Sequence, residues 1–256
     1  MGDRPALAVT AHDPGAHLLP GLKRVAGRVQ ELFSGVGALI TEETSPAIES
    51  FLRVELGASI AREAADVAAI GRHRRISVDL ARHCTSAGVL HSDLDHLLRW
   101  IEADHGEVSQ CLRVGGTTDL LVVGRTQAAM DACPRRLRET ERVVNHIHQL
   151  ITGRAWDLMF AIRHLSPRAC ESIVRLGRED TLANDVEWPL LCESLGLEVD
   201  YLAASHLSYL TTEDFDGAGD TRDDDPELWI QRVEVLHLDA LALRRFIARP
   251  EGPPPG

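Results

Sequence analysis

Short aliphatic runs alternate with longer amphipathic segments over the first half of the chain. The aliphatic runs end in polar or turn-forming residues and predict four strands, at residues 6–11, 36–41, 87–92 and 119–123. Helical spacing of apolar residues predicts one helix through Leu22, Val25, Val29 and Leu32, and a second from Phe51 to Ala69. This alternation of strand and helix predicts a parallel sheet with right-handed crossovers.

The second half of the chain has a mainly helical pattern. One helix is predicted to end at Gly153, and its apolar face consists of Leu137, Val144, Ile147 and Ile151. Another begins at an N-cap, Ser166, and stops at Gly177. A short helix ending at Gly196 and a strand over residues 197–205 follow.

Composition and charge divide the chain into four parts. We expect a main α/β domain over residues 1–212, an acidic flexible loop over 213–226, a C-terminal helix over 227–248 and a disordered tail over 249–256. The loop prediction rests on seven acidic residues and two glycines between residues 213 and 225.

The overall composition excludes several classes of protein. The formal net charge is −12, which opposes binding to nucleic acid. No apolar run reaches the ~18 residues that span a bilayer, and the N-terminus lacks a secretory core, so we expect a cytoplasmic protein without a transmembrane segment. The five cysteines are spread out and odd in number, which predicts neither a disulfide framework nor a zinc ribbon.

Acidic residues follow three of the predicted strands. Asp13 follows the first strand, Glu42 and Glu43 the second, and Asp93 and Asp95 the third. In an open parallel sheet the carboxyl ends of the strands meet at one edge, where ligands bind. Carboxylates gathered there suit Mg²⁺ or Mn²⁺, which prefer oxygen ligands and bridge phosphates. The alternative is that Asp93 and Asp95 cap a helix that begins after them.

The stretch "GRHRRISVDLARHCTSAGVLHSDLDHLLRW" resembles the central element of GT-A glycosyltransferases, in which a glycine and an arginine precede a helix and an apolar strand that ends in D-x-D. The opening "ALAVTAHDPGAHLLPGLKRV" is similar to the first strand, loop and helix of that fold. By this resemblance Asp93 and Asp95 bind the metal of a nucleotide-diphosphate sugar, and Asp93 also contacts the sugar nucleotide. Asp13 lies near its base, and Arg75 lies near its ribose or diphosphate. The second strand ends in "EET" where the family usually has two aspartates, so Glu42 is the residue implied there.

The same resemblance suggests residues for the acceptor side. "LANDVEWPLL" looks like the acidic acceptor motif of the superfamily, in which Asp185 or Glu187 would be the general base. His206 would be a third metal ligand. The structural alternatives remain open, because acids are also favoured in the first turn of a helix and a single histidine often serves a hydrogen-bonding role.

The sequence therefore predicts a GT-A-like (Rossmann-like) α/β fold, with a mostly parallel sheet flanked by helices and a helix-rich C-terminal part. The predicted function is metal-dependent transfer of a sugar from a nucleotide-diphosphate sugar to an unknown acceptor, with Mn²⁺ or Mg²⁺ as cofactor, and the chain is compatible with a homo-oligomer. One alternative is a haloacid-dehalogenase-type phosphatase, in which Asp93 is the nucleophile and Asp95 the general acid. Another is a GT-A-like domain that binds a ligand without catalysis.

Overall fold

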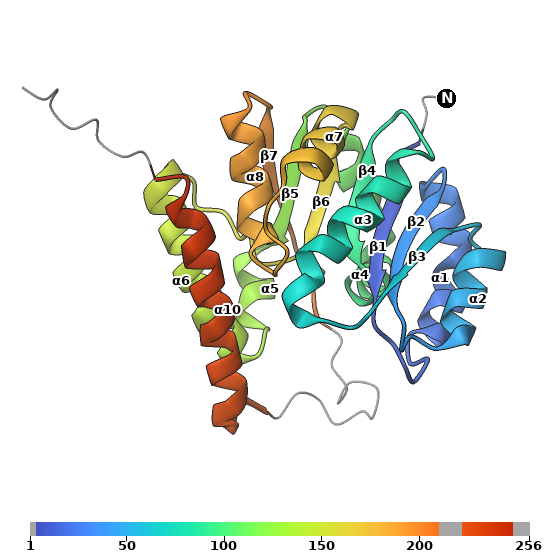
Figure 1. Ribbon diagram of the computed structural model, residues 1–256, viewed down its shortest axis with the longest axis horizontal. Coiled ribbons are helices and arrows are strands. Elements are labelled where there is room, and N and C mark those ends of the chain that lie inside the picture. Colours follow the sequence, from blue (N-terminus) through green and yellow to red (C-terminus); the bar gives the residue numbers. More distant parts are fainter. Residues whose placement is uncertain (1–3, 210–221, 248–256) are drawn as a thin grey trace, which may run out of the picture.

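The computed structural model describes residues 4–209 and 222–247 and contains one seven-stranded sheet with helices on both faces (Figure 1). The strands are β1 (Ala6–Ala11), β2 (Val36–Thr41), β3 (Ser59–Glu63), β4 (Val89–Asp93), β5 (Leu120–Arg125), β6 (Ile162–Leu165) and β7 (Val199–Ala204). The α-helices are α1 (Leu19–Leu32), α2 (Pro46–Val54), α3 (Ile70–Arg82), α4 (Leu94–Gly115), α5 (Gln127–Asp131), α6 (Arg135–Thr152), α7 (Pro167–Leu176), α8 (Asn184–Ser194) and α10 (Pro226–Arg244). Two 3₁₀ turns are η1 (Val67–Ala69) and η2 (Arg222–Asp224).

The sheet is mostly parallel, as the sequence predicts. Its strand order is β3-β2-β1-β4-β6-β5-β7, and β6 is antiparallel to both of its neighbours, β4 and β5. The five strands expected from the sequence are all present, with ends shifted by at most two residues. From β1 the chain adds β2 and β3 on one side of the sheet, and β4 and the later strands lie on the other side. In open α/β sheets such a change of direction leaves a crevice beyond the carboxyl ends of the two central strands, here β1 and β4.

Two strands were not expected from the sequence. The predicted helix from Phe51 to Ala69 is wrong: α2 ends at Val54, Gly57 turns the chain with a φ of +63°, and β3 follows. β3 is a partly exposed edge strand without an aliphatic run, so its sequence gives little sign of a strand. β6 is equally inconspicuous because its central residues, Arg163 and His164, are polar although both are buried.

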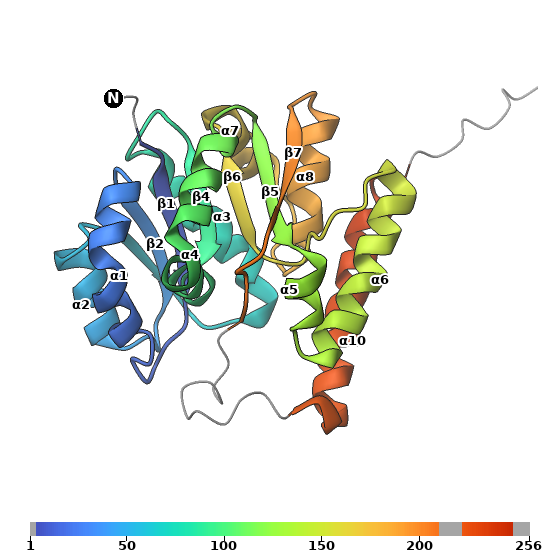
Figure 2. The same cartoon turned by 180° about the vertical axis from the view of Figure 1, so that it is seen from behind.

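Two hydrophobic cores lie on opposite faces of the sheet. Helices α1, α2 and α4 cover one face, and α3, α7 and α8 cover the other, as the two opposite views show (Figures 1 and 2). Each core contains a fully buried tryptophan, Trp100 in the first and Trp188 in the second. At Gly37 on β2, helix α3 approaches so closely that a Cβ would lie 2.3 Å from the backbone nitrogen of Ala81. Only glycine fits at that contact.

Several predicted helix ends are confirmed. Ser166 caps α7 by accepting a hydrogen bond from the backbone N–H of Ala169, and Gly153 ends α6 with a φ of +77°. The C-terminal helix is α10, and it packs against α6 and α8 at one end of the sheet. Most of the predicted acidic loop, and the predicted disordered tail, lie outside the described residues. Within residues 4–209 and 222–247, no helix has the length and apolarity that a bilayer-spanning segment needs.

Candidate functional site

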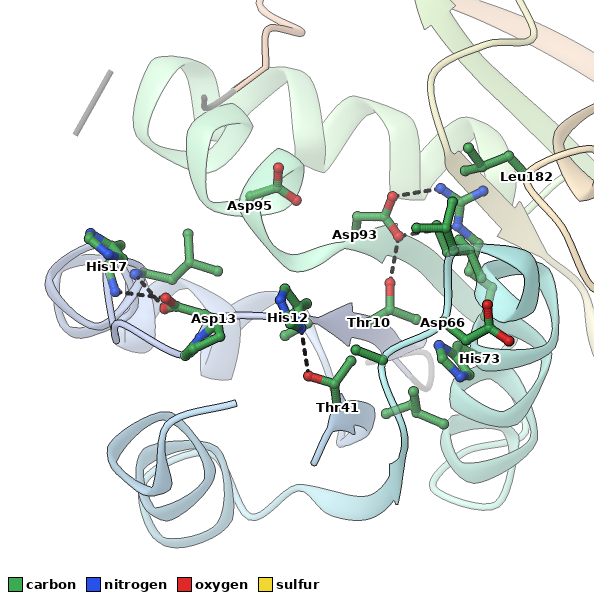
Figure 3. Close-up of a pocket in the computed structure, with 18 of the residues that line it drawn as sticks. Thr10, His12, Asp13, His17, Thr41, Asp66, His73, Asp93, Asp95 and Leu182 are labelled. Atoms are coloured by element: carbon green, nitrogen blue, oxygen red, sulfur yellow. Dashed lines mark hydrogen bonds and ion pairs between the residues drawn. The ribbon is translucent and has the colours of Figure 1, made fainter. Parts of the chain in front are cut away.

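A cavity of about 770 Å³ opens beyond the carboxyl ends of β1, β2 and β4. Its wall comes from the loop after β1, the end of β2, the segment from η1 into α3, and the junction of β4 with α4 (Figure 3). Asp13, Asp93 and Asp95, three of the residues predicted to bind ligand, line it. Leu182 closes the wall from the loop before α8. The structure therefore brings these three carboxylates to one crevice, as the sheet topology predicts.

Asp13 builds the wall of the cavity through its hydrogen bonds. Its carboxylate accepts hydrogen bonds from the backbone N–H groups of His17 (2.9 Å) and Leu18 (2.8 Å), just before α1 begins. Its own backbone N–H donates to the Thr44 hydroxyl at 3.3 Å, which ties the loop after β1 to the loop after β2. Asp13 is only 4% exposed, so its main effect is to fix the shape of this loop.

Asp93, the last residue of β4, is held by an arginine from α3. Its carboxylate accepts hydrogen bonds from Arg74 Nε at 3.2 Å and Nη2 at 2.6 Å, and from the Thr10 hydroxyl at 2.5 Å. Arg74 also donates from Nη1 to Asn184 (2.9 Å) and to Asp185 (3.0 Å). A planar guanidinium can serve several acceptors in this way because its donors form a fixed fork.

The charges in this cluster keep Asp93 ionised. Burial by itself would raise the pKa of Asp93, but the charge of Arg74 and its hydrogen bonds outweigh burial and bring the pKa well below the usual carboxyl range. Arg74 is 2% exposed and lies between two carboxylates, so its own charge is compensated inside the protein. The cluster joins Asp93 at the end of β4 to α8, which carries Asp185.

Asp95 lies in the first turn of α4, two residues after Asp93 (Figure 3), and no arginine among the described residues forms an ion pair with it. Its side chain is one-third exposed, and the His96 ring lies 3.8 Å away. Burial raises the pKa of Asp95, and the neighbouring charge of Asp93 raises it further. An additional cation near this carboxylate would be favoured for that reason.

Arg75 and Glu187 do not line the cavity, contrary to their predicted roles. The Arg75 guanidinium pairs with Asp180 and donates to the backbone carbonyl of Glu179. The Glu187 carboxylate accepts hydrogen bonds from the backbone N–H groups of residues 178 and 179, at 2.9 and 3.0 Å. It therefore holds the same loop that Arg75 contacts. Successive residues of a helix point about 100° apart, which is why Arg74 faces Asp93 and its neighbour does not.

Glu42 and His206 are also placed away from the cavity wall. Glu42 is exposed after β2 and uses its backbone carbonyl to accept from Arg62 at 2.7 Å. The His206 ring lies 3.7 Å from Asp104 and 3.6 Å from Glu107, beyond the middle of α4. Asp104 lies at a kink in α4, nine residues after Asp95, and the helical turns between the two residues span about 13 Å. His206 is therefore not positioned to share a metal with Asp95, and the described residues contain no group of three metal-binding side chains.

The sequence reasoning missed Arg74, Asn184 and Thr10. The "RHRR" run at residues 72–75 drew attention to this segment, but the helical register that selects Arg74 depends on where α3 begins. Asp185, predicted as a catalytic base, joins these residues through its 3.0 Å contact with Arg74 and does not line the cavity. Its carboxylate is buried and already paired, so proton transfer to an acceptor would require that pairing to change.

A second, smaller cavity of about 360 Å³ lies between Arg99 of α4, α5 and the start of α6. It is lined by Arg99, Arg135, Arg138, Tyr209 and Asp223, among others. Arg99 follows Asp95 by four residues on α4, so the two side chains occupy neighbouring positions on one helix face. The Tyr209 ring contacts the His96 ring, with their centroids 5.0 Å apart. This second cavity therefore contains three arginines and one aspartate.

Solved structures with the same fold exist, although the sequence comparisons are negative. No protein-family model matches the chain, and the curated protein sequences give no match. The chain is similar to crystal structures of glucosyl-3-phosphoglycerate synthase from Mycobacterium tuberculosis. The complex with phosphoglyceric acid has a TM-score of 0.59 at 12% identity, covering 98% of this chain and 82% of that one.

Two further structures of that enzyme carry a metal and a nucleotide. The complex with Mn²⁺, uridine diphosphate and phosphoglyceric acid has a TM-score of 0.56 at 13% identity, and covers 98% of this chain and 80% of that one. The complex with Mg²⁺ and uridine diphosphate has a TM-score of 0.56 at 11% identity, and covers 98% and 81%. At these identities the similarity concerns the fold. The chain has the GT-A-like α/β fold that its sequence predicts.

Proposed function

We propose that this protein transfers a glycosyl group from a nucleoside diphosphate sugar bound in the larger cavity, with Mn²⁺ or Mg²⁺ as cofactor. The observation that carries the proposal is the placement of Asp93 and Asp95 at the carboxyl end of β4, in a 770 Å³ cavity at the crevice of this sheet. The structurally similar glucosyl-3-phosphoglycerate synthase has been solved with such a metal and uridine diphosphate.

The residues present fit a cation that is shared with the donor. The carboxylate of Asp93 is occupied by Arg74 and Thr10. Asp95 and the exposed Asp66 also line the cavity, and neither carboxylate pairs with an arginine among the described residues. Mg²⁺ and similar ions are commonly held by one or two carboxylates together with substrate phosphates. When bound, the ion would neutralise negative charge that develops on the leaving diphosphate.

The surrounding residues position the donor side of the reaction. Arg74 keeps Asp93 ionised and fixed, and Asp13 holds the loop after β1 in place for the nucleotide. We assign Asp185 a positioning role, because its carboxylate orients Arg74 and does not line the cavity. Glu187 stabilises the loop before α8 in the same indirect way.

The acceptor is proposed to carry a negatively charged group. The smaller cavity contains Arg99, Arg135 and Arg138, and arginine suits carboxylate and phosphate groups. Phosphoglyceric acid accompanies the nucleotide in the similar solved structure. A phosphatase mechanism with Asp93 as nucleophile is disfavoured, because both of its oxygens accept hydrogen bonds from Arg74 and one also accepts from Thr10.

Thermal unfolding with ligands tests the proposal. Because the described residues contain no group of three metal-binding side chains, Mn²⁺ alone should change the Tm little, whereas Mn²⁺ with UDP-glucose or GDP-glucose should raise it. A ligand at 100 times its Kd stabilises by about 2.7 kcal/mol. Asp95→Asn should abolish the rise, and Asp104→Asn, on the same helix outside the cavity, should retain it. If neither nucleotide sugar stabilises the wild type with metal, the proposed function is wrong. Binding without release of the nucleoside diphosphate would identify a binding module.

A further inference from the structure

One end of the larger cavity differs in chemistry from the end that carries Asp93 and Asp95. It is built by the end of β2 and by the segment from η1 into α3, and its lining includes the apolar side chains of Leu39, Val67 and Ile70. Strand β1 separates β2 from β4, so the ends of these two strands lie about 10 Å apart, because neighbouring strands are spaced by about 4.8 Å. A ligand that fills the cavity therefore meets carboxylates at one end and apolar side chains at the other.

A buried histidine without a hydrogen bond lies at this apolar end. Four polar side chains of the cavity wall are buried, namely Asp13, Thr41, His73 and Arg74. Asp13 and Arg74 form hydrogen bonds to the chain, and the Thr41 hydroxyl lies 2.8 Å from the ring of His12. The His73 ring forms none within the described residues, although it is only 4% exposed and its Nε2 is enclosed. Buried polar groups are normally hydrogen-bonded, so this ring lacks a partner that a ligand in the cavity could supply.

The surroundings of His73 suit a planar heterocyclic ring. The His73 ring projects from α3 beside Asp66 (Figure 3). Burial lowers its pKa below the ordinary value, and the charge of Arg72 lowers the pKa further, so the ring is neutral at neutral pH. A neutral imidazole has one donor and one acceptor nitrogen, and a nucleobase also carries donors and acceptors along its edge. An apolar pocket with a few polar groups is the usual form of a binding site for such a ligand.

Asp13, which the sequence resemblance places near the base, is less suited to recognise it. Its carboxylate is buried, and both oxygens already accept hydrogen bonds from backbone N–H groups, those of His17 and Leu18. A base that took over these oxygens would leave two backbone donors without a partner, which is costly in a buried place. His73 has no such hydrogen bonds to give up.

We propose that His73 contacts the nucleobase of the donor at the apolar end of the larger cavity and determines which base is accepted. This role rests on the proposed glycosyl transfer, because it requires a nucleoside diphosphate sugar in this cavity. The diphosphate then lies at the end of the cavity that carries Asp95, and the ribose spans the distance to the end of β2. Val67 and Ile70 supply the apolar surface beside the base.

The affinities for four nucleoside diphosphates test this role. UDP, CDP, GDP and ADP share the diphosphate and differ in the base, so the ratios of their Kd values, measured calorimetrically with Mg²⁺, report recognition of the base. The wild type should bind the preferred base about tenfold more tightly than the least favoured one. His73→Phe should reduce that ratio by about five- to tenfold, because it keeps a ring and removes both nitrogens. His83→Phe, at the exposed C-cap of α3, should leave the ratio unchanged.

Two further measurements separate recognition of the base from a structural role of His73. Pyrophosphate with Mg²⁺ lacks a base and should bind the wild type and His73→Phe equally. His73→Gln keeps a donor and an acceptor in a different position and should change the order of preference among the four bases. If none of the nucleotides binds the wild type with metal, the proposed function fails and the base site fails with it. If they bind without discrimination, or if either His73 variant keeps the wild-type ratios, the role of His73 is wrong and the proposed function stands.

Discussion

Removing the arginine that joins β4 to α8 gives a demanding test of the site described above. In Arg74→Met the aliphatic length is kept and the guanidinium is lost, so that two carboxylates with little access to water lose their partner. The side chains of Arg74, Asp93 and Asp185 are 3%, 20% and 6% exposed. Removing one member of a buried ion pair typically costs about 3–5 kcal/mol, because the remaining charge stays buried. We expect the free energy of unfolding to fall by about that amount at neutral pH.

The effect of this substitution should depend on pH with a definite sign. In the wild type the pKa of Asp93 is lower in the folded protein than in the unfolded chain, so its stabilising contribution is present above about pH 4 and is lost as the pH falls toward the folded value. Without Arg74, the largest opposition to burial is lost, and the pKa of Asp93 rises. The folded variant then binds a proton more readily than its unfolded chain, and its deficit relative to wild type shrinks on acidification.

Urea unfolding of both proteins between pH 7 and pH 4 measures this difference. The control is Arg72→Met, two residues earlier on α3, whose surface ion pair with Glu63 has partners 46% and 30% exposed. Surface pairs contribute about 0–1 kcal/mol, so the control should remain close to wild type at every pH. A deficit for Arg74→Met below about 1 kcal/mol, or one that is constant over this pH range, would refute the role given to Arg74.

Three further outcomes are expected. Gly37→Ala should destabilise the protein by about 1–3 kcal/mol in thermal unfolding, because the new Cβ would clash with α3. Gly27→Ala, where no atom lies within 4 Å of the new Cβ, should stabilise α1 by about 0.5–1 kcal/mol. Equal effects of the two substitutions would contradict the close contact at Gly37. Glu187→Gln should lower stability and raise proteolysis of the loop at residues 178–180, and Glu193→Gln on the same helix should do neither. Burial lowers the pKa of three histidines, to about 3 for His91 and about 4 for His148 and His164. Each stays neutral in the fold, so stability should fall below about pH 6.5, by up to about 1.4 kcal/mol per pH unit for each histidine, and a stability that stays flat from pH 7 to 5 would contradict this.

The sequence by itself determined the elements whose signals are local. Aliphatic runs located five of the seven strands, and Ser166 and Gly153 marked helix ends, because capping and turn conformations depend on a few neighbouring residues. The order of strands and helices then brought Asp13, Asp93 and Asp95 to one edge of the sheet, since parallel strands align their carboxyl ends. The fold and the place of the cavity could therefore be predicted without coordinates.

Only the tertiary structure decided which polar side chains face that cavity. Two adjacent arginines in "RHRR" differ by about 100° around α3, and the packing of α3 on the sheet directs Arg74 to Asp93 and Arg75 to the loop at residues 179–180. His206 follows β7, which is the edge strand farthest from β3. It lies near Asp104 and Glu107 of α4 and not at the cavity beyond β1, β2 and β4. β3 pairs with the preceding strand β2, and β6 pairs with β5 and β4. These pairings form through backbone hydrogen bonds, so the side chains of β3 and β6 give little sign of them. The local sequence sets the spacing of apolar residues and so decides whether a segment is a helix or a strand. The direction in which its side chains point, and the elements it contacts, depend on residues far away in the chain.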